Sequence, residues 1–407
     1  MPQPSLVFSC FLVILSRNSS EAGYFSGALM SRHDFQIPVT FEHRVVFTRN
    51  AFAPDNPELA EILVEGGGRR VMVIVEQTVA AVWPRLALEI EAYLAPTGLD
   101  FRGLHVLSGG EPVKTDDAHV REVWHWIDDA HLDRHSYLLA VGGGAFLDAV
   151  GFAAATAHRG VRLVRFPTTT LSQDDSGVGV KCAINAFGKK NWIGTFAVPF
   201  AVINDFRFLH SQNEETRVAG LIEALKVALV KDRGFFEWME ANCHILATLE
   251  PSALEYCVEK SALLHAQHIA GGGDAFESGS SRPLDFGHWA AHKLEALTGY
   301  RLSHAEAVAI GLALDTLYST RAGMAPANVA ERVFRIFKDL KFSTYHPALD
   351  WLDDSGQRRV LGGLDEFREH LGGELTVLML RDIGEGMDVH CIDPAIVEAC
   401  IDDLRDR

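Results

Sequence analysis

Length, composition and charge exclude several classes of protein before any motif is considered. The chain has 407 residues, of which 48% are hydrophobic, so it is globular and long enough for two domains. Its net charge of -17 argues against binding to nucleic acid or to an anionic membrane, because both partners need a basic surface. Six scattered cysteines without a CxxC motif favour a reduced, cytoplasmic protein with neither a thiolate zinc site nor a disulfide framework.

The first 34 residues stand apart from the rest of the chain. They contain the apolar run LVFSCFLVIL, which is too short to span a membrane and has no basic segment before it. The patterned sequence begins near Phe35, and Met30 offers another start. We therefore expect residues 1–34 to be a disordered extension or to follow from a start codon placed too early.

Residues 35–210 alternate between strand patterns and helix patterns. Short apolar runs typical of buried strands occur in RRVMVIVEQTV, LHVLSGG, SYLLAVGGG and VRLVRFP, and amphipathic helical patterns separate them. This alternation predicts a mostly parallel sheet covered by helices on both faces. The expected fold class of this region is therefore a Rossmann-like α/β domain.

Three glycines mark the end of the third of these strands. Gly142, Gly143 and Gly144 end the apolar run, and a helical pattern starts at once. Glycines at such a turn let the backbone approach a pyrophosphate, whose charge the helix N-terminus stabilises. The GxGxxG spacing is incomplete, so an ordinary tight turn is the alternative. Asp148 follows on the first helical turn, near the expected place of a ribose or nicotinamide.

A polar, glycine-rich loop is predicted after the strand that ends at Pro167. Thr168 and Thr169 open it, and its charged and amide side chains include Asp175, Lys181, Lys189, Lys190 and Asn191. Hydroxyls, an acid and several cations after a strand are typical of a site for a phosphorylated molecule. A solvated, turn-rich loop is the alternative.

From Ser211 onward helical periodicities dominate, and we expect residues 211–407 to form an all-helical second domain. The predicted helices cover residues 215–232, 234–249, 253–270, 306–323 and 329–340, and a helical segment that carries His288 and His292 lies between the third and the fourth of them. Between two of them lies GGGDAFESGSSRP, residues 271–283. It is interpreted as a lid over the neighbouring site or as a plain linker.

Three histidines and one glutamate predict a metal site in the helical region. His288 and His292 are four residues apart and share a helix face, and His304 returns after a Gly-Tyr break. Glu223 and Lys226 are three residues apart in GLIEALKVALV, so a carboxylate and an ammonium face the same way. A carboxylate with imidazoles suits a catalytic zinc that keeps an open position. The alternative is a set of ordinary helix histidines.

Taken together, the motifs resemble the 3-dehydroquinate synthase family of sugar-phosphate cyclases, which use NAD and a divalent metal. GGEPVK resembles the family's nucleotide-contacting turn, GGGAFLD its pyrophosphate loop, and PTTTLSQDDSGVGVKCAIN its PTT...DSSVGGKTGIN. GKKN resembles the family's GKN, and EALK resembles the segment that carries its metal-ligand glutamate and active-site lysine. FGHWAAH resembles the family's FGHxxGH, and HAEAVAIG resembles its HGEAVAIG. The resemblance runs from about Val71 to beyond Gly311.

The resemblance implies a role for each matched residue. The implied metal ligands are Glu223, His288 and His304. His292, a candidate ligand on helical spacing, is instead implied to contact the substrate phosphate. The implied nucleotide contacts are Glu111, Lys114, Gly143, Gly144, Asp148, Thr168, Thr169 and Lys190. The implied substrate-pocket residues are Asp175, Lys181, Asn191, Lys226 and Lys260. Arg159 is implied to reach the neighbouring subunit's substrate phosphate, so a homodimer is expected.

Two departures from the family pattern bear on the substrate. SRPLD places Asp285 where the family's Arg-x-x-x-Asn has asparagine, and shifts Arg282 by one position. The C-terminal Lys-Lys motif is replaced by LDEFREHLGG, where Arg368 and His370 are the nearby cations. These departures resemble the divergent, Ebo-type branch of dehydroquinate-synthase-like proteins. An aspartate beside the metal would repel a carboxylate and accept hydrogen bonds from hydroxyls, so a neutral heptulose 7-phosphate is an alternative substrate.

The resemblance implies a cyclase in which NAD is returned unchanged while phosphate leaves a seven-carbon sugar phosphate and a carbocycle closes. Zinc is the expected metal, with cobalt as the alternative. A glycerol-dehydrogenase-like zinc alcohol dehydrogenase is a rival that would release NADH. A non-catalytic NAD-binding scaffold is a second rival, and it would hold no zinc. The set of lysines in the expected pocket favours the cyclase.

Overall fold

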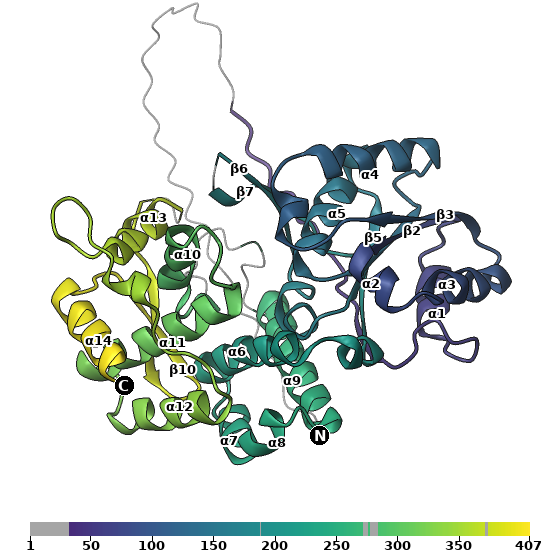
Figure 1. Ribbon diagram of the computed structural model, residues 1–407. Coiled ribbons are helices and arrows are strands. Elements are labelled where there is room, and N and C mark those ends of the chain that lie inside the picture. The colour runs from purple at the N-terminus through teal and green to yellow at the C-terminus, as the bar shows by residue number, and fades with distance from the viewer. Residues whose placement is uncertain (1–31, 188, 272–275, 277–283, 371–372) are drawn as a thin grey trace, which may run out of the picture. The chain divides into compact units, whose positions relative to one another are not determined.

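The computed structural model describes residues 32–187, 189–271, 276, 284–370 and 373–407 (Figure 1). Residues 32–40 contain neither helix nor strand, and residues 41–407 form one compact unit. Residues 1–31 and nearly all of the proposed lid, including Arg282, lie outside the described residues, and so do the expectations made for them. Within the described part, we find no helix with the length and apolar character that crossing a membrane requires.

A six-stranded sheet organises the first half of the unit, with the strand order β1-β8-β5-β4-β2-β3 and every neighbouring pair parallel. Its strands are β1 (Val45–Thr48), β2 (Arg70–Glu76), β3 (Asp100–Leu107), β4 (Tyr137–Gly142), β5 (Arg162–Pro167) and β8 (Ala201–Asp205). All six residues of β4 are buried, as expected for a continuous apolar run in the middle of a parallel sheet. The predicted parallel sheet is confirmed.

Helices cover both faces of this sheet (Figure 1). On β2, Val71, Val73 and Val75 pack with one group of helices, whereas Met72 and Ile74 pack with the other. The alternation follows from the two-residue period of a strand. The first group contains α1 (Glu58–Glu65), α2 (Gln77–Val82) and α3 (Leu86–Leu94), and the second contains α4 (Ala118–Asp129) and α5 (Gly144–Thr156).

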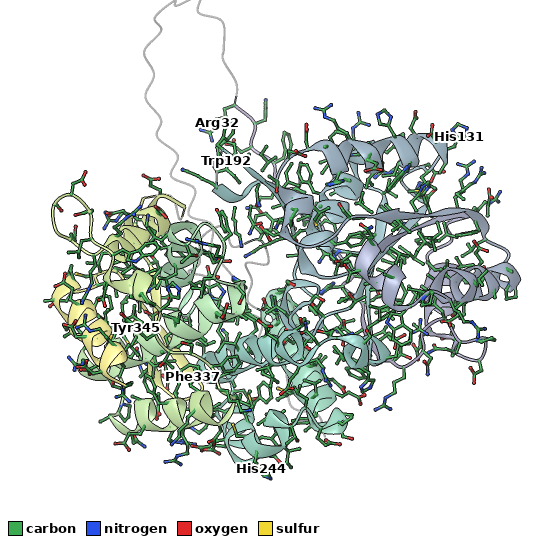
Figure 2. The ribbon with its side chains drawn as sticks, viewed as in Figure 1. Arg32, His131, Trp192, His244, Phe337 and Tyr345 are labelled. Carbon is green, nitrogen blue, oxygen red and sulfur yellow. The ribbon has the colours of Figure 1, made fainter. Side chains whose placement is uncertain are left out.

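The second half of the unit is mostly helical. Its helices are α6 (Glu214–Lys231), α7 (Arg233–Ala241), α8 (Cys243–Ala247), α9 (Pro251–Gly271), α10 (His288–Leu297), α11 (His304–Arg321), α12 (Asn328–Asp339), α13 (Gly362–His370) and α14 (Pro394–Asp406). Phe337 lies in their shared core and His244 at the surface (Figure 2). The predicted fold class is confirmed with one correction: this half is not all-helical, because β9 (Val377–Asp382) and β10 (Glu385–Val389) form an antiparallel hairpin.

The polar loop predicted after the strand that ends at Pro167 is also more ordered than expected. It begins with a helical turn, η4 (Ser172–Ser176), and continues as an antiparallel hairpin of β6 (Lys181–Ala186) and β7 (Lys189–Phe196). The apolar alternation in β6 and β7 is short and mixed with glycines and lysines, which hid the strands. The turn η4 packs against α6 and α9, so it brings the polar residues of this segment next to the helical half.

Candidate active site

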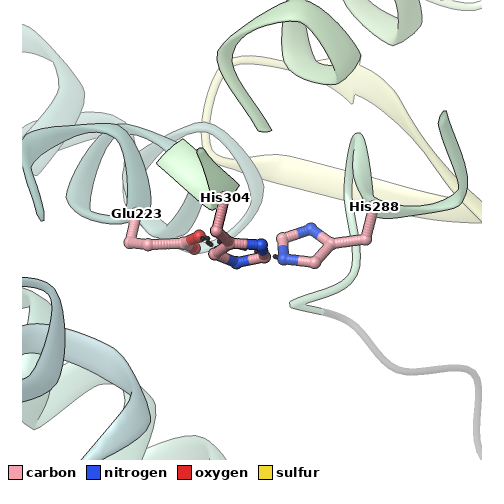
Figure 3. A group of neighbouring side chains, drawn as sticks. All are labelled: Glu223, His288 and His304. Atoms are coloured by element: carbon pink, nitrogen blue, oxygen red, sulfur yellow. Dashed lines mark ion pairs between the residues drawn. The ribbon is translucent and has the colours of Figure 1, made fainter. Parts of the chain in front are cut away.

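Three residues from separate helices converge on one point: Glu223 from α6, His288 from the start of α10 and His304 from the start of α11 (Figure 3). One ligand atom from each lies within 4.8 Å of the others. The Oε1 atom of Glu223 is 3.5 Å from Nε2 of His304 and 3.8 Å from Nε2 of His288. The structure therefore brings together the three residues predicted to bind a metal.

Local sequence fixes both histidines at helix starts. Gly287 is the N-cap of α10: its φ of 77° favours glycine, and its carbonyl oxygen accepts from Ala291 N in the first turn of the helix. A Cβ atom on Gly287 would lie 2.6 Å from the backbone nitrogen of Leu312, and one on Gly311 would overlap the Gly287 carbonyl. The two glycines thus allow α10 and α11 to approach closely. Ser303 caps α11 in a capping box with Glu306.

We expect Gly311→Ala to destabilise the protein by about 1–3 kcal/mol, because the new methyl group overpacks the contact with Gly287. The measurement is urea unfolding, followed by circular dichroism. Gly271→Ala is the matched control, since a Cβ atom there meets no atom of the described residues within 4 Å. Equal stability of the two variants would contradict this account of the close helix approach.

Hydrogen bonds orient the His288 ring and the start of its helix. The Nδ1–H group of His288 donates to the carbonyl oxygen of Phe286 at 3.0 Å, which leaves the Nε2 lone pair facing Glu223. The carboxylate of Asp315 accepts from Gly287 N and from Trp289 Nε1, both at 2.9 Å. Burial raises the pKa of Asp315 to about 7.

A chain of buried charges continues from Glu223. Lys226 Nζ lies 2.5 Å from Glu223 Oε2 and 3.7 Å from Asp175 Oδ1, and His265 Nδ1 lies 3.0 Å from the same Asp175 oxygen. Burial would lower the pKa of Lys226, but the carboxylates of Asp175 and Glu223 raise it above its ordinary value. Lys226 therefore carries a positive charge beside the cluster.

The residues fit a divalent metal ion. Both carboxylate oxygens of Glu223 are buried: Oε2 is ion paired with Lys226, whereas Oε1 faces the rings of His304 and His288 at 3.5 and 3.8 Å, longer than ordinary hydrogen bonds. Burial would lower the pKa of His304, but the carboxylates of Glu223 and Glu295 raise it to about 10, so His304 holds a proton where an ion would bind. Metal binding would displace that proton. One carboxylate and two imidazoles are ligands that zinc prefers.

The predicted nucleotide contacts gather at the carboxyl ends of the strands. Gly143 and Gly144 form the turn from β4 into α5, and Thr168 and Thr169 follow β5. Lys114, in the short helix η2 (Glu111–Lys114), is buried and donates to Asp148 Oδ2 at 2.6 Å. This edge of a parallel sheet is where α/β folds bind ligands.

Two predicted residues lie among these nucleotide candidates or beside them. Asn191, predicted for the substrate pocket, accepts a hydrogen bond from Lys114 and so lies with the nucleotide set. Lys190 is ion paired with Glu295 and lies 3.8 Å from Glu111, which also accepts from Asn185 at 2.9 Å. The hairpin of β6 and β7 thus joins the two halves of the candidate site.

Other predicted residues lie farther from the histidine cluster or at its margin. Lys260 on α9 is ion paired with Asp232 at 2.8 Å, and Arg159 is exposed at the end of the short helix η3 (Ala157–Arg159). Lys181 is exposed at the start of β6. Asp285 precedes α10, where its charge raises the pKa of Lys226 in addition to the larger effects of Asp175 and Glu223.

Arg368 and His292 have contrasting surroundings. Arg368 is exposed on α13, where it is ion paired with Asp365 at 3.0 Å. The ring of His292 is exposed and lies 5.5 Å from the ring of His288 and 6.2 Å from that of His304, measured between centroids. His292 therefore flanks the cluster on its solvent side.

Sequence reasoning missed two glutamates. Glu76 ends β2, and its Oε2 atom accepts from Gly143 N at 2.6 Å, so an acid lies directly against the glycine turn. Its only signal was an acid at the end of a buried strand. Glu295 is buried and contacts His304 and Lys190. Its position three residues after His292 and seven after His288 places it on the same helix face, which was a readable signal.

Comparison with known proteins adds independent findings. The family model for the 3-dehydroquinate synthase N-terminal domain matches residues 104–219, and the model for the C-terminal domain matches residues 220–354. The chain is 34% identical to 3-dehydroquinate synthase of Bordetella pertussis over 336 residues, which cover 82% of this chain and 90% of the relative. It is also 34% identical to 2-epi-5-epi-valiolone synthase of Streptomyces glaucescens over 317 residues, covering 77% and 79%.

A solved structure agrees with these matches. ValA, a 2-epi-5-epi-valiolone synthase from Streptomyces hygroscopicus subsp. jinggangensis with NAD+ and Zn2+ bound, superposes with a TM-score of 0.81 at 27% identity. The match covers 92% of this chain and 99% of ValA. A 2-deoxy-scyllo-inosose synthase structure shares the fold, with a TM-score of 0.72 at 19% identity. The chain belongs to the 3-dehydroquinate synthase family.

Proposed function

We propose that this protein is an NAD- and zinc-dependent sugar-phosphate cyclase that eliminates phosphate from a seven-carbon sugar phosphate and closes a carbocycle. The observation that carries the proposal is the convergence of Glu223, His288 and His304 beside the positively charged Lys226. The activities of the related 3-dehydroquinate and 2-epi-5-epi-valiolone synthases support it. We assign residues 35–210 to a nucleotide-binding domain and residues 211–407 to a metal- and substrate-binding domain.

Glu223, His288 and His304 would hold the metal, and the glycine turn at Gly143 and Gly144 would hold the nucleotide. When bound, the two groups would supply reversible hydride acceptance and Lewis-acid polarisation of the reacting oxygen. The turn suits a pyrophosphate because Gly143 and Gly144 carry no side chains at the N-terminus of α5, so the backbone can approach an anion there.

The chain's own residues would orient the substrate and balance its charge. Lys226 would donate to a substrate hydroxyl and stabilise negative charge that develops on oxygen, while Asp175 keeps the ammonium charged and aimed. His292, Lys181 and the partner subunit's Arg159 would bind the phosphate; Asn191, expected there from the resemblance, lies instead beside Lys114 among the nucleotide candidates. Anchoring the phosphate far from the reacting carbon positions the chain of the sugar for elimination.

Incubation with a panel of seven-carbon phosphates, with inorganic phosphate as the readout, tests the proposal. A cyclase releases phosphate and accumulates no NADH. Net NADH formation from a polyol without phosphate release would instead establish the rival zinc alcohol dehydrogenase. A wild-type protein that binds neither zinc nor NAD would establish the rival scaffold.

A neutral heptulose 7-phosphate is the second candidate substrate, and Asp285 favours it. The Asp285 carboxylate lies near Lys226 and His288, and its carbonyl oxygen accepts from His288 N at 3.0 Å. An aspartate in this place would disfavour a substrate carboxylate, because two negative charges about 4 Å apart repel by roughly 1 kcal/mol in bulk water and roughly 4 kcal/mol near a protein surface. The substrate of the dehydroquinate pathway carries such a carboxylate and would meet this repulsion, whereas a neutral heptulose 7-phosphate would not.

We expect Asp285→Asn to raise phosphate release from the carboxylate substrate relative to the neutral one by about tenfold, since 1.4 kcal/mol corresponds to that factor. The measurement is kcat/KM for both substrates with both proteins. Asp365→Asn, on exposed α13, is the matched control and should leave the ratio unchanged. A wild type that prefers the carboxylate substrate and loses that rate in Asp285→Asn would contradict the selectivity argument.

Finally, we infer a cytoplasmic homodimer. Arg159 is exposed in the short segment that follows α5. Arg159 and His158 both have left-handed backbone conformations, with φ values of 64° and 50°. An exposed arginine in this place supports a contribution to a second subunit's phosphate site. The free thiols at Cys182, Cys243, Cys257, Cys391 and Cys400 support a reducing compartment. Analytical ultracentrifugation tests the dimer.

A further inference from the structure

Glu295 is a buried carboxylate that contacts two basic groups at once. It lies on α10, is 1% exposed, and has no role in the sequence-based assignment. Its Oε2 atom is 3.4 Å from Nδ1 of His304, and its Oε1 atom is 2.6 Å from Nζ of Lys190. A buried carboxylate needs such partners to stay ionised.

The contact with His304 is on the nitrogen that faces away from the metal cluster. His304 directs Nε2 towards Glu223, so Nδ1 is available to donate to a carboxylate. A carboxylate on the outer nitrogen of a ligating histidine fixes the tautomer and the ring orientation and raises the basicity of the inner nitrogen. His288 has a weaker outer partner, the carbonyl oxygen of Phe286.

A second metal site is the competing interpretation. His292, Glu295 and His304 offer ligand atoms within 4.8 Å of one another. However, Lys190 already supplies a positive charge at Oε1 of Glu295, and its Nζ atom also lies 5.1 Å from the centre of the Tyr300 ring. An ion bound by Glu295 Oε2 and His304 Nδ1 would have to replace the contact between those two atoms and would lie next to the Lys190 ammonium. The geometry therefore favours a single ion at Glu223, His288 and His304, with Glu295 in contact with the outer nitrogen of His304.

We propose that Glu295 is a positioning residue that holds His304 in the tautomer and orientation required for metal binding, with Lys190 as its counter-charge. The inference rests on the metal centre of the proposed function. It adds a residue from α10 to the site and links that site to the hairpin of β6 and β7 through Lys190.

Zinc affinity of Glu295→Gln, measured by competition with a chromogenic chelator, tests the proposal. We expect a 10- to 100-fold weaker affinity, the range typical for loss of an outer partner of a metal ligand. The Co2+-substituted variant should also show a shifted visible absorption band, which a general loss of stability would not produce. Glu255→Gln is the matched control: Glu255 is a buried glutamate paired with Arg49.

The outcomes separate this inference from the function on which it rests. A wild-type protein that binds no zinc overturns both. A wild type that binds zinc, together with Glu295→Gln of unchanged affinity and unchanged cobalt spectrum, overturns the inference alone. An equal loss of affinity in Glu255→Gln overturns it as well, because the effect would then be a general one.

A measurement on the wild type keeps the test decisive if Glu295→Gln does not fold. In protein labelled with 15N-histidine and loaded with 113Cd2+, we expect His304 to be protonated at Nδ1 and coupled to the metal through Nε2. Coupling through Nδ1 would overturn the proposal, since Glu295 would then lie on the nitrogen that binds the ion.

Discussion

Phosphate release by His288→Ala is expected to fall about 1,000-fold, because the variant loses one of three ligands and with it the metal's stabilisation of charge. Several kcal/mol of transition-state stabilisation are attributed to such an ion, and about 4 kcal/mol corresponds to that factor. The ring of His288 is buried and its Nε2 atom faces Glu223, so the substitution removes a ligand atom from inside the cluster. Phosphate release and bound zinc should be measured on the same preparation.

His244→Ala is the control for this experiment, since His244 is an exposed histidine in the same helical half (Figure 2). It should retain full zinc and full activity. A His288→Ala variant that keeps both would remove His288 from the metal site and leave the proposed function without its central observation.

Lys226→Met is expected to lower the free energy of unfolding of the metal-free protein by about 3–5 kcal/mol. The substitution keeps the length of the side chain but leaves the buried carboxylates of Glu223 and Asp175 without their shared cation, and removing one member of a buried ion pair costs about that much. Urea unfolding in the presence of a chelator measures the change. With zinc added the loss should be smaller, because the ion neutralises Glu223.

Lys231→Met on the same helix is the matched control, since Lys231 is exposed at the end of α6. It should change the unfolding free energy by less than about 0.5 kcal/mol, the usual range for a surface substitution. If Lys226→Met unfolds at the same urea concentration as the control, then Lys226 is not the cation on which the buried carboxylates depend.

The parallel sheet was predictable from sequence because its signals are local. The apolar run at residues 137–142 is buried along its whole length, and the glycines that follow it mark the turn into α5. The hairpin of β9 and β10 was missed because its five- and six-residue strands are short and include charged residues such as Arg381 and Glu385. Short strands of this kind are specified by their packing on helices rather than by pattern.

Some residues of the candidate site were likewise predictable from local sequence, and others were not. The helical spacing of His288 and His292 and the spacing of Glu223 and Lys226 identified the right helices, but spacing alone made His292 a ligand candidate. In the structure His304 completes the group with Glu223 and His288. This choice depends on how three helices cross, which no local pattern contains. For Glu76 the relevant contact is with a backbone amide 67 residues away, so residue type alone gave little warning.

The unequal exposure of the three expected ligands has a kinetic consequence. Glu223 is fully buried and His288 nearly so, whereas the side chain of His304 is one-third exposed. An ion that leaves must first part from His304 and then wait for a local opening of the helix starts, so exchange should be slow compared with turnover. Purified protein would then carry whichever divalent ion was abundant when the chain folded. Metal content would record the growth medium as much as intrinsic preference.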